Sequence, residues 1–289
     1  MSLAIGCDVG GTNTRVALVD VDSGRLVAIR KHPSYVADYK RGLAALADDI
    51  RSFGENVPVG VAIAAQLDPG RRRALVAPNL KWQNVRLADD LEKLVKAPVA
   101  LENDVRGAAY GELRFGALRG VTGTAASVFW GSGIGGALIA AGQVLPGALS
   151  IAGEIGHLTY KANGIMCPCG KRGCYEAYVG GHALARRSKM PTRDLFARGG
   201  KLASEAIAIM GQHVGNLATL IDPDAIVIGG SIGLETFTEL KKAVLPHLLV
   251  VRRGKLKLVR AKLGDHAGVL GAAVIAALAA SARSSSAFP

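Results

Sequence analysis

The feature that most constrains the fold of this chain is a repeated unit in which a short apolar run ends in glycines. It occurs three times, as LAIGCDVGG at residues 3–11, ASVFWGSGIGG at 126–136 and AIVIGG at 225–230. Each run has the length and the β-branched or aromatic content that are typical of a buried strand. Glycine lets the backbone turn tightly and lets a ligand approach it closely. The pattern therefore predicts strands whose ends carry binding loops.

Helical patterns alternate with these strands, which favours an α/β protein whose loops bind ligands at the carboxyl edges of its sheets. The two halves each open with a strand–glycine–strand unit, so we expect two similar α/β domains facing each other across a cleft. The smaller domain is predicted at 1–117 plus 265–289, and the larger at 118–264. The predicted strands lie within 3–31, 57–64, 98–103, 124–143, 224–230 and 255–259, and the predicted helices within 38–53, 104–116, 202–223 and 268–282.

The net charge of +12 over 289 residues raises the question of a polyanionic partner. The basic residues are scattered, with small clusters at 71–73, 186–187 and 252–262. We interpret them as a solvated surface that mildly attracts phosphate-bearing ligands, and we expect no specific nucleic acid partner. The amino terminus has no basic leader followed by an apolar run, and 268–282 is short for a membrane span. We therefore expect a cytoplasmic protein without membrane attachment, in which 268–282 is a buried helix.

Two residues with chemically capable side chains are predicted to belong to the core. Cys7 lies in a buried strand and is expected to be inert. His213 lies on one stripe of the helix at 202–223, so we expect a packed histidine and not a ligand. The stripe consists of Leu202, Ala206, Ile209, His213, Leu217 and Leu220.

The first glycine motif is DVGGTNTR, residues 8–15. Gly10 and Gly11 would bring backbone amides close to an anion, and the next two residues, Thr12 and Asn13, add side-chain donors. Asp8 lies where a hydrated divalent cation that bridges phosphates would need a carboxylate. A plain hairpin turn explains this motif equally well when it is taken alone.

The second and third glycine motifs strengthen the phosphate interpretation. GSGIGG at 131–136 includes Ser132 and Gly133, and IGGS at 228–231 includes Gly229 and Gly230 before a predicted helix. Two loops between strands suit a nucleotide phosphate tail bound from both sides, and a nucleoside could lie at the third.

LENDVRGAAYGE places two polar residues at a strand-to-helix junction. Asp104 is well placed to be a helix N-cap, which is a common structural role. A carboxylate fixed at that edge, beside Asn103, could also accept a proton from a substrate hydroxyl during phosphoryl transfer. In such a transfer, positioning and charge neutralisation matter more than a strong base.

HLTYKANGIMCPCGKRGCYE, residues 157–176, contains Cys167, Cys169 and Cys174, with His157 ahead of them. Three cysteines and one histidine are the four ligands that zinc prefers in a closed structural site. A disulfide is disfavoured because three neighbouring cysteines leave one unpaired and no export signal precedes them. We therefore predict a structural zinc site, with Gly170 and Gly173 permitting the tight turns.

Together these motifs resemble the ROK family (repressors, open reading frames and sugar kinases), which has the actin-like, ribonuclease H-like ATPase fold. DVGGTNTR resembles the first phosphate motif of the family and GSGIGG the second, while AGEIGH with CPCGKRGCYEAY resembles its signature and zinc knuckle. The likeness runs over almost the whole chain. It implies ATP and Mg²⁺ as cofactors in addition to structural Zn²⁺, and a homodimer.

The resemblance also implies roles for individual residues. Asp104 would be the general base, and His157 would bind zinc through one ring nitrogen and a sugar hydroxyl through the other. The remaining sugar-binding residues would be Asn79, Asn103, Glu154 and Glu176. The chain departs from the family pattern at Ala64-Ala65-Gln66 and at Leu80-Lys81-Trp82. Both departures leave the identity of the sugar open.

The favoured function is therefore an ATP-dependent hexose kinase similar to glucokinase, which phosphorylates the 6-hydroxyl. An N-acetylmannosamine or N-acetylglucosamine kinase, a fructokinase and a glucokinase that uses polyphosphate remain alternatives. A sugar-responsive transcriptional regulator is the alternative without catalysis. Relatives of that class carry a helix-turn-helix ahead of the first strand, and here the strand begins at Leu3.

Overall fold

The computed structural model describes residues 2–286, with side chains through residue 283, and it divides into two units. Unit 1 comprises Met1–Arg119, Pro146–Ala152 and Leu263–Pro289, and unit 2 comprises Gly120–Leu145 and Gly153–Lys262. These boundaries lie two residues from those that the sequence suggests at 117 and 264. The assignment of Pro146–Ala152 to unit 1 has no counterpart in the sequence analysis.

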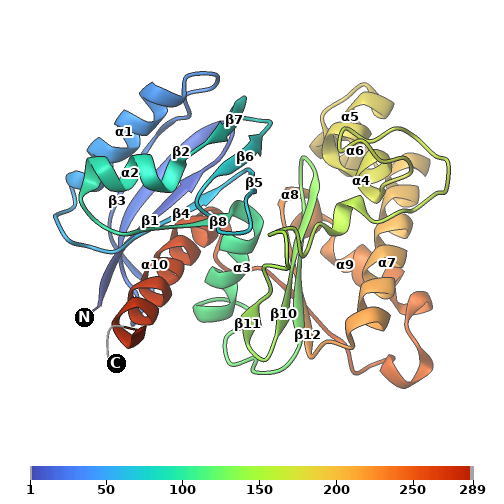
Figure 1. Cartoon of the computed structure of the whole chain (residues 1–289). Coiled ribbons are helices and arrows are strands. Elements are labelled where there is room, and N and C mark those ends of the chain that lie inside the picture. The colour runs from blue at the N-terminus through green and yellow to red at the C-terminus, as the bar shows by residue number, and fades with distance from the viewer. Residues whose placement is uncertain (1, 287–289) are drawn as a thin grey trace. The chain divides into compact units, whose positions relative to one another are not determined.

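The main sheet of unit 1 has the strand order β3-β2-β1-β4-β8 (Figure 1). Its strands are β1 (Leu3–Val9), β2 (Asn13–Asp20), β3 (Arg25–Pro33), β4 (Val59–Ile63) and β8 (Val99–Asn103). β1 pairs antiparallel with β2 and parallel with β4, and β4 pairs parallel with β8. The carboxyl ends of β1, β4 and β8 therefore meet at one edge of the sheet.

The main sheet of unit 2 repeats this topology, in the order β11-β10-β9-β12-β13. Its strands are β9 (Ala125–Trp130), β10 (Ile134–Ala140), β11 (Gln143–Val144), β12 (Ala225–Gly229) and β13 (Lys257–Arg260). β9 pairs antiparallel with β10 and parallel with β12, as β1 does with β2 and β4. The prediction of two similar α/β units is confirmed.

Two buried clusters lie on opposite faces of the first sheet, because side chains alternate along each strand. Ile5 and Val9 pack with α1 (Tyr39–Arg51) and α2 (Leu87–Val95), whereas Ala4 packs with α10 (Ala267–Ser286). α10 also packs against α3 (Asp104–Arg114). Helices thus cover both faces of this sheet, as its continuous apolar strands require.

α10 lies directly on the backbone of two strands. A Cβ added at Gly6 would be 1.9 Å from the carbonyl oxygen of Val269, and one at Gly60 would be 1.9 Å from that of Ala272. By length and composition Gly264–Arg283 could cross a membrane, but half of the apolar stretch is buried within the protein. The prediction of a buried helix at 268–282 agrees with this packing.

In unit 2, α7 (Lys201–Ile221) carries the predicted apolar stripe. Ala206, Ile209 and Leu217 are buried, and His213 is fully buried. The prediction for Leu220 is wrong: this residue is 73% exposed, because the last turn of α7 faces the core with Leu217, Ala218 and Ile221 and turns Leu220 to solvent.

Several elements are absent from the sequence analysis. A small antiparallel sheet of β5 (Gln66–Leu67), β6 (Ala74–Ala77) and β7 (Trp82–Val85) follows β4 in unit 1. Unit 2 adds the helices α4 (Tyr175–Val179), α5 (Gly181–Ser188), α6 (Thr192–Arg198) and α9 (Phe237–Val244). The helix predicted after the third glycine motif is present as α8 (Ser231–Glu235). The short 3₁₀ turns are Ile155–His157, Leu245–His247, Val250–Arg252 and Gly264–His266.

Candidate active site and metal centre

Asp104 is the first residue of α3, directly after β8. The N-cap is Asn103, whose side-chain oxygen accepts from the N–H of Val105 at 3.0 Å and of Arg106 at 3.2 Å. The N-cap role considered for Asp104 is therefore filled by Asn103, because α3 begins at Asp104, one residue earlier than a cap at Asp104 would require. This arrangement leaves the carboxylate of Asp104 available for another role.

The Oδ1 atom of Asp104 accepts from the N–H of Val105 and from the side-chain amide of Asn103, both at 2.9 Å. No hydrogen bond to Oδ2 is found within the part of the chain that the structure describes. Desolvation raises the pKa of Asp104, although these donors and the charge of Arg106 oppose the increase. The hydrogen bonds to Oδ1 therefore orient the carboxylate, and Oδ2 is the oxygen that can accept a proton.

Asp8 lies near Asp104, at the end of β1. Arg15 donates to Asp8 at 3.4 Å and to Asp265 at 2.8 Å. Burial and the charge of Asp104 raise the pKa of Asp8 to about 6, against the effect of Arg15. A cation would offset the charge of Asp104 that raises the pKa of Asp8, and oxygen ligands suit Mg²⁺.

Asn79 lies beside the turn at Gly10-Gly11. A Cβ added at Gly11 would be 2.5 Å from the Cβ of Asn79, so only glycine allows this approach. The N–H of Gly10 donates to the carbonyl of Asn13 at 3.1 Å and closes the turn. Neither glycine has a positive φ, so side-chain packing and not backbone strain explains Gly11. Thr12 is exposed in the same turn.

In unit 2, the loop between β9 and β10 contains Ser132 and Gly133. The carboxylate of Glu176, on α4, accepts from the N–H of Ile134 at 2.7 Å. A Cβ at Gly133 would be 2.5 Å from that carboxylate. Glu176 is therefore a direct neighbour of the second glycine loop, a contact that the sequence analysis does not include.

The third glycine motif joins β12 to α8. Gly230 has a φ of +78° and lies against the backbone of Trp130, where no Cβ would fit. A pocket of about 270 Å³ opens at the other end of α8. Its lining residues come from α6 to α9 and the segments that join them: Phe196, Gly199, Ala203, Ser204, Ile207, Glu235, Thr236 and Glu239.

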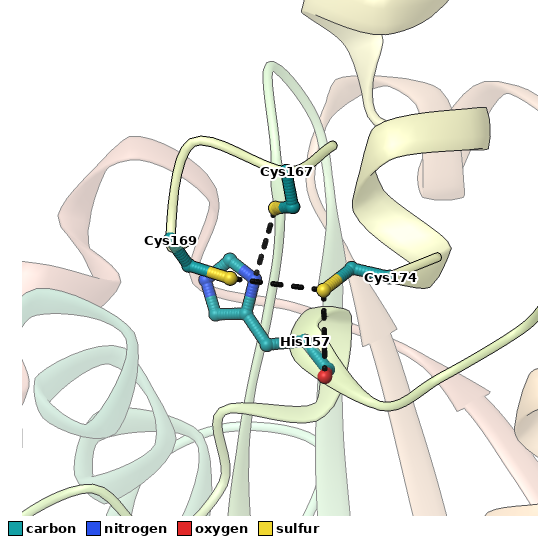
Figure 2. A group of neighbouring side chains, drawn as sticks. All are labelled: His157, Cys167, Cys169 and Cys174. Atoms are coloured by element: carbon teal, nitrogen blue, oxygen red, sulfur yellow. Dashed lines mark hydrogen bonds between the residues drawn. The ribbon is translucent and has the colours of Figure 1, made fainter. Parts of the chain in front are cut away.

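His157, Cys167, Cys169 and Cys174 point toward one another (Figure 2). Their ligand atoms all lie within 4.8 Å of each other. Cys167 Sγ is 3.6 Å from His157 Nδ1, and Cys169 Sγ is 3.7 Å from Cys174 Sγ. Zinc–sulfur bonds of about 2.3 Å and zinc–nitrogen bonds of about 2.0–2.1 Å in a tetrahedron give edges of about 3.6 and 3.8 Å. The four residues therefore fit a tetrahedral metal ion, and all four cysteines of the chain are free thiols.

Tight local structure brings these ligands together. The N–H of Cys167 donates to the carbonyl of Lys171, and that of Gly170 donates to Cys167, which closes a short hairpin. Gly170 and Gly173 have φ values of +90° and +80°, which fits the prediction that these glycines permit tight turns. Cys174 is the N-cap residue of α4, which connects the cluster to Glu176.

The two ring nitrogens of His157 have different surroundings. Nδ1 faces Cys167, whereas Nε2 is 3.9 Å from a carboxylate oxygen of Glu154. The division of labour that the resemblance implies, with metal on one nitrogen and a hydroxyl on the other, is compatible with this geometry.

The predicted residues are distributed over both units. Unit 1 contains Asp8, Gly10, Gly11, Thr12, Asn13, Asn79, Asn103 and Asp104, and unit 2 contains Ser132, Gly133, Glu154, His157, Cys167, Cys169, Cys174, Glu176, Gly229 and Gly230.

Glu102 and Arg106, whose buried ion pair adjoins Asp104, were not predicted as site residues. The signal that points to them is the spacing of opposite charges four residues apart in LENDVRG. Asp265 was not predicted either, because no local pattern indicates its contact with Arg15, 250 residues away.

Comparisons with known proteins agree with these motifs. The chain is 30% identical to the glucokinase of Streptomyces coelicolor, over 96% of this chain and 98% of that protein. It is 27% identical to an N-acetyl-D-glucosamine kinase of Yersinia pseudotuberculosis, over 93% and 97%.

Two solved structures share the fold. One is the ROK hexokinase of Thermus thermophilus, with a TM-score of 0.85 and 31% identity, over 97% of this chain and 99% of that chain. The other is the ROK glucokinase of Streptomyces griseus, solved with glucose and AMPPNP, with a TM-score of 0.81 and 29% identity, over 96% and 99%. The two units thus have the actin-like ATPase fold. A sequence model of the ROK family matches residues 4–279, and the chain belongs to that family.

Proposed function

We propose that this protein is an ATP-dependent glucokinase that transfers the γ-phosphoryl group of ATP to the 6-hydroxyl of glucose. The observation that carries the proposal is the carboxylate of Asp104, oriented through Oδ1 at the start of α3 in a chain 30% identical to a glucokinase. The structural neighbour solved with glucose and AMPPNP supports the same pair of substrates.

Asp104 is the general base. Its Oδ2 accepts the proton of the sugar hydroxyl as the oxygen attacks the γ-phosphorus, and the bond to the leaving ADP oxygen breaks. The raised pKa makes Asp104 a better proton acceptor than an exposed aspartate. Since the transition state for this transfer is loose, the fixed position of the carboxylate contributes as much as its basicity.

The other sugar hydroxyls are assigned to side chains that can both accept and orient hydrogen bonds. These are Asn79, Asn103, Glu154, His157 and Glu176. His157 offers Nε2 for this purpose, since Nδ1 faces the cysteines. Asn103 already uses its oxygen as the helix cap and its amide toward Asp104, so a hydroxyl here would join an existing network.

The nucleotide is assigned to the glycine loops. Gly10, Gly11, Thr12 and Asn13 and, in unit 2, Ser132 and Gly133 contact phosphates, and Gly229 and Gly230 lie at the nucleoside. The pocket lined by Glu235 and Thr236 lies in the same unit, at the other end of α8 from Gly229 and Gly230. Asp8 would hold Mg²⁺ through water, and the cation would neutralise charge on the phosphates.

The cluster of His157, Cys167, Cys169 and Cys174 would hold structural zinc. Four protein ligands would leave no open position, so the ion would fix structure and would not activate water. Its assigned effect is to hold the ring of His157 and the start of α4, which carries Glu176. We further assign the protein to the cytoplasm as a homodimer.

The test is a coupled assay of ADP formation over a panel of hexoses and N-acetylhexosamines. Glucose should give the highest kcat/KM. A preference for N-acetylglucosamine, the sugar in the name of the relative from Yersinia, would replace the sugar assignment but keep the kinase activity. Glucose 6-phosphate formed from polyphosphate, in place of ATP, would agree with the basic surface and would replace the donor. No turnover of any sugar with either donor would refute the proposal.

A further inference from the structure

Next to Asp104 lies an ion pair that is almost entirely buried. The side chains of Glu102 and Arg106 are each 1% exposed, and Nε of Arg106 donates to Oε1 of Glu102 at 2.8 Å. Glu102 is the next-to-last residue of β8, and Arg106 lies in the first turn of α3. The pair therefore spans the junction at which Asp104 is placed.

Glu102 has two further donors. Its Oε2 accepts from Arg71 at 2.9 Å, and its Oε1 accepts from the N–H of Asn103 at 2.9 Å. The carboxylate thus joins the N-cap residue of α3 to the loop between β5 and β6. The position of Asn103, whose amide holds Oδ1 of Asp104, depends on this carboxylate.

Arg106 also reaches a segment distant in the sequence. Its Nη1 donates to the carbonyl of Ala152 at 3.3 Å. Ala152 ends the loop Pro146–Ala152, which is closed by a hydrogen bond from the N–H of Ala152 to the carbonyl of Pro146 at 3.1 Å. Glu154, an assigned sugar ligand, follows two residues later. One guanidinium therefore contacts the segment that leads to Glu154 as well as the junction that carries Asp104.

Stability alone does not explain this arginine. Its Nη2 is buried and has no hydrogen-bond partner among the described residues. An unpaired buried donor costs about 1–3 kcal/mol, and a buried ion pair is often no more stable than apolar side chains of the same volume. A buried polar group that adds little stability calls for another explanation.

We propose that Arg106 is a positioning residue for phosphoryl transfer, which holds Asp104 and the segment before Glu154 in register through Glu102 and Ala152. The inference rests on the proposed function. Arg106 acts through other groups and contacts no substrate in this account.

The positive charge of Arg106 has an effect on Asp104 that can be measured separately from its packing. It lowers the pKa of Asp104, against the effect of desolvation. The other charged groups that act at this place are Glu102 and its partner Arg71, and Asp8 and its partner Arg15. These four remain when Arg106 is changed, so a shift in the titration of Asp104 can be assigned to Arg106.

The experiment compares kcat as a function of pH in three variants. Arg106→Met should lower kcat by about 10- to 100-fold, the effect expected of a carboxylate misplaced by about 1 Å. The acid limb of its pH profile, where kcat falls at low pH, should move to higher pH, because Asp104 loses a nearby positive charge. Glu102→Gln should move the limb to lower pH, since Arg71 and Arg106 lose their counter-charge. Arg106→Lys keeps the charge and should return the limb toward its original position without restoring kcat fully.

The matched control is Arg72→Met. Arg72 is in the same loop as Arg71 and pairs with Asp89 and Glu92. It also donates to the carbonyl of Val99, at the start of β8, and among the described residues no hydrogen bond joins it to Glu102, Asn103 or Asp104. This variant should lose stability, measured by thermal unfolding, but keep the kcat and the pH profile of the wild type. An equal fall in kcat for Arg72→Met, or an unmoved acid limb in Arg106→Met, would overturn the inference.

A second readout does not depend on activity. Hydrogen exchange of the amides at 103–107 and 146–157 should be faster in Arg106→Met than in the wild type, and unchanged in Arg72→Met. If the wild type phosphorylates no sugar, the proposed function fails, whereas unchanged exchange in Arg106→Met overturns the positioning role separately.

Discussion

At the scale of single residues, the site combines groups whose electrostatic surroundings differ. Asp104 and Asp8 both have raised pKa values, but Asp8 has Arg15 as a direct partner and Asp104 has only neutral donors. The assignment of Asp104 as base and of Asp8 as cation ligand follows from this difference. It can be tested by neutral substitutions that keep the shape of each side chain.

Asp104→Asn should reduce kcat by about 10²- to 10⁴-fold, because the amide cannot accept the proton of the hydroxyl. The affinity for glucose, measured by calorimetry, should change less than a few-fold. Asp38→Asn is the matched control, since Asp38 caps α1 in the same unit and asparagine caps a helix equally well. A kcat near that of the wild type in Asp104→Asn would exclude this residue as the base.

His213 makes the stability of the protein depend on pH. Desolvation lowers its pKa to about 4, and neither ring nitrogen has a hydrogen-bond partner among the described residues. The ring packs on Tyr175 at a centroid distance of 4.2 Å. The unfolded chain, with a histidine pKa near 6.5, binds the proton first as pH falls. The free energy of unfolding should therefore decrease between about pH 6.5 and pH 4, by an amount on the order of 3 kcal/mol.

His213→Phe keeps the ring and removes the titration. Denaturant unfolding from pH 7 to pH 4.5 should give a smaller decrease for this variant than for the wild type. Because the other ionisable groups are the same in both proteins, only the difference between the two curves is assigned to His213. Parallel curves would show that this histidine is not held neutral by the core. His213→Leu provides a second comparison in case the larger ring strains the core.

At the scale of elements, the sequence predicts best where pattern and local chemistry agree. The runs that form β1, β4, β8, β9 and β12 were expected because each is apolar, short and bounded by turn residues. The strands β5 to β7 were missed because they are short and irregular, and only their mutual pairing defines them. The identity of the cap at α3 was wrong by one residue, a difference that depends on backbone angles and not on composition.

In the candidate site, too, the features that a local pattern encodes were predictable and the long-range contacts were not. The cysteine cluster was predictable because its ligands lie within 18 residues, so spacing alone limits their geometry. The contacts of Glu176 with Ile134 and of Arg106 with Ala152 join segments more than 40 residues apart. No local pattern encodes such distances, so these contacts emerge only from the packed structure.

The hairpin that carries the cysteines should lose its structural role when one ligand is removed. Cys169→Ser should lower the zinc content measured by atomic emission, together with the affinity for glucose, because His157 and the start of α4 are no longer fixed. Cys7→Ala is the control: Cys7 is buried in β1, where burial raises its pKa above the ordinary range, and it should leave zinc unchanged. Full zinc content in Cys169→Ser, or a wild type that is active without metal, would contradict the structural role.

At the scale of the whole molecule, two sheets of the same topology are built from different parts of the chain. The sheet of unit 1 is covered on one face by α10, which comes from the carboxyl-terminal part of the sequence. Unit 1 is therefore complete only when segments separated by more than 140 residues have come together. The close approach of α10 to β1 and β4 is possible because Gly6 and Gly60 have no side chains.

Gly60→Ala should weaken this contact. The added Cβ would be 1.9 Å from the carbonyl oxygen of Ala272, a backbone atom that cannot move without the helix. Overpacking of this kind costs about 1–3 kcal/mol, so the melting temperature of unit 1 should fall by several degrees in calorimetry. Gly70→Ala is the control, because the nearest atom to its Cβ would be a flexible side-chain oxygen at 3.4 Å. An unchanged melting temperature in Gly60→Ala would mean that α10 can shift away from the sheet without cost, and the carboxyl-terminal helix would then not determine the stability of unit 1.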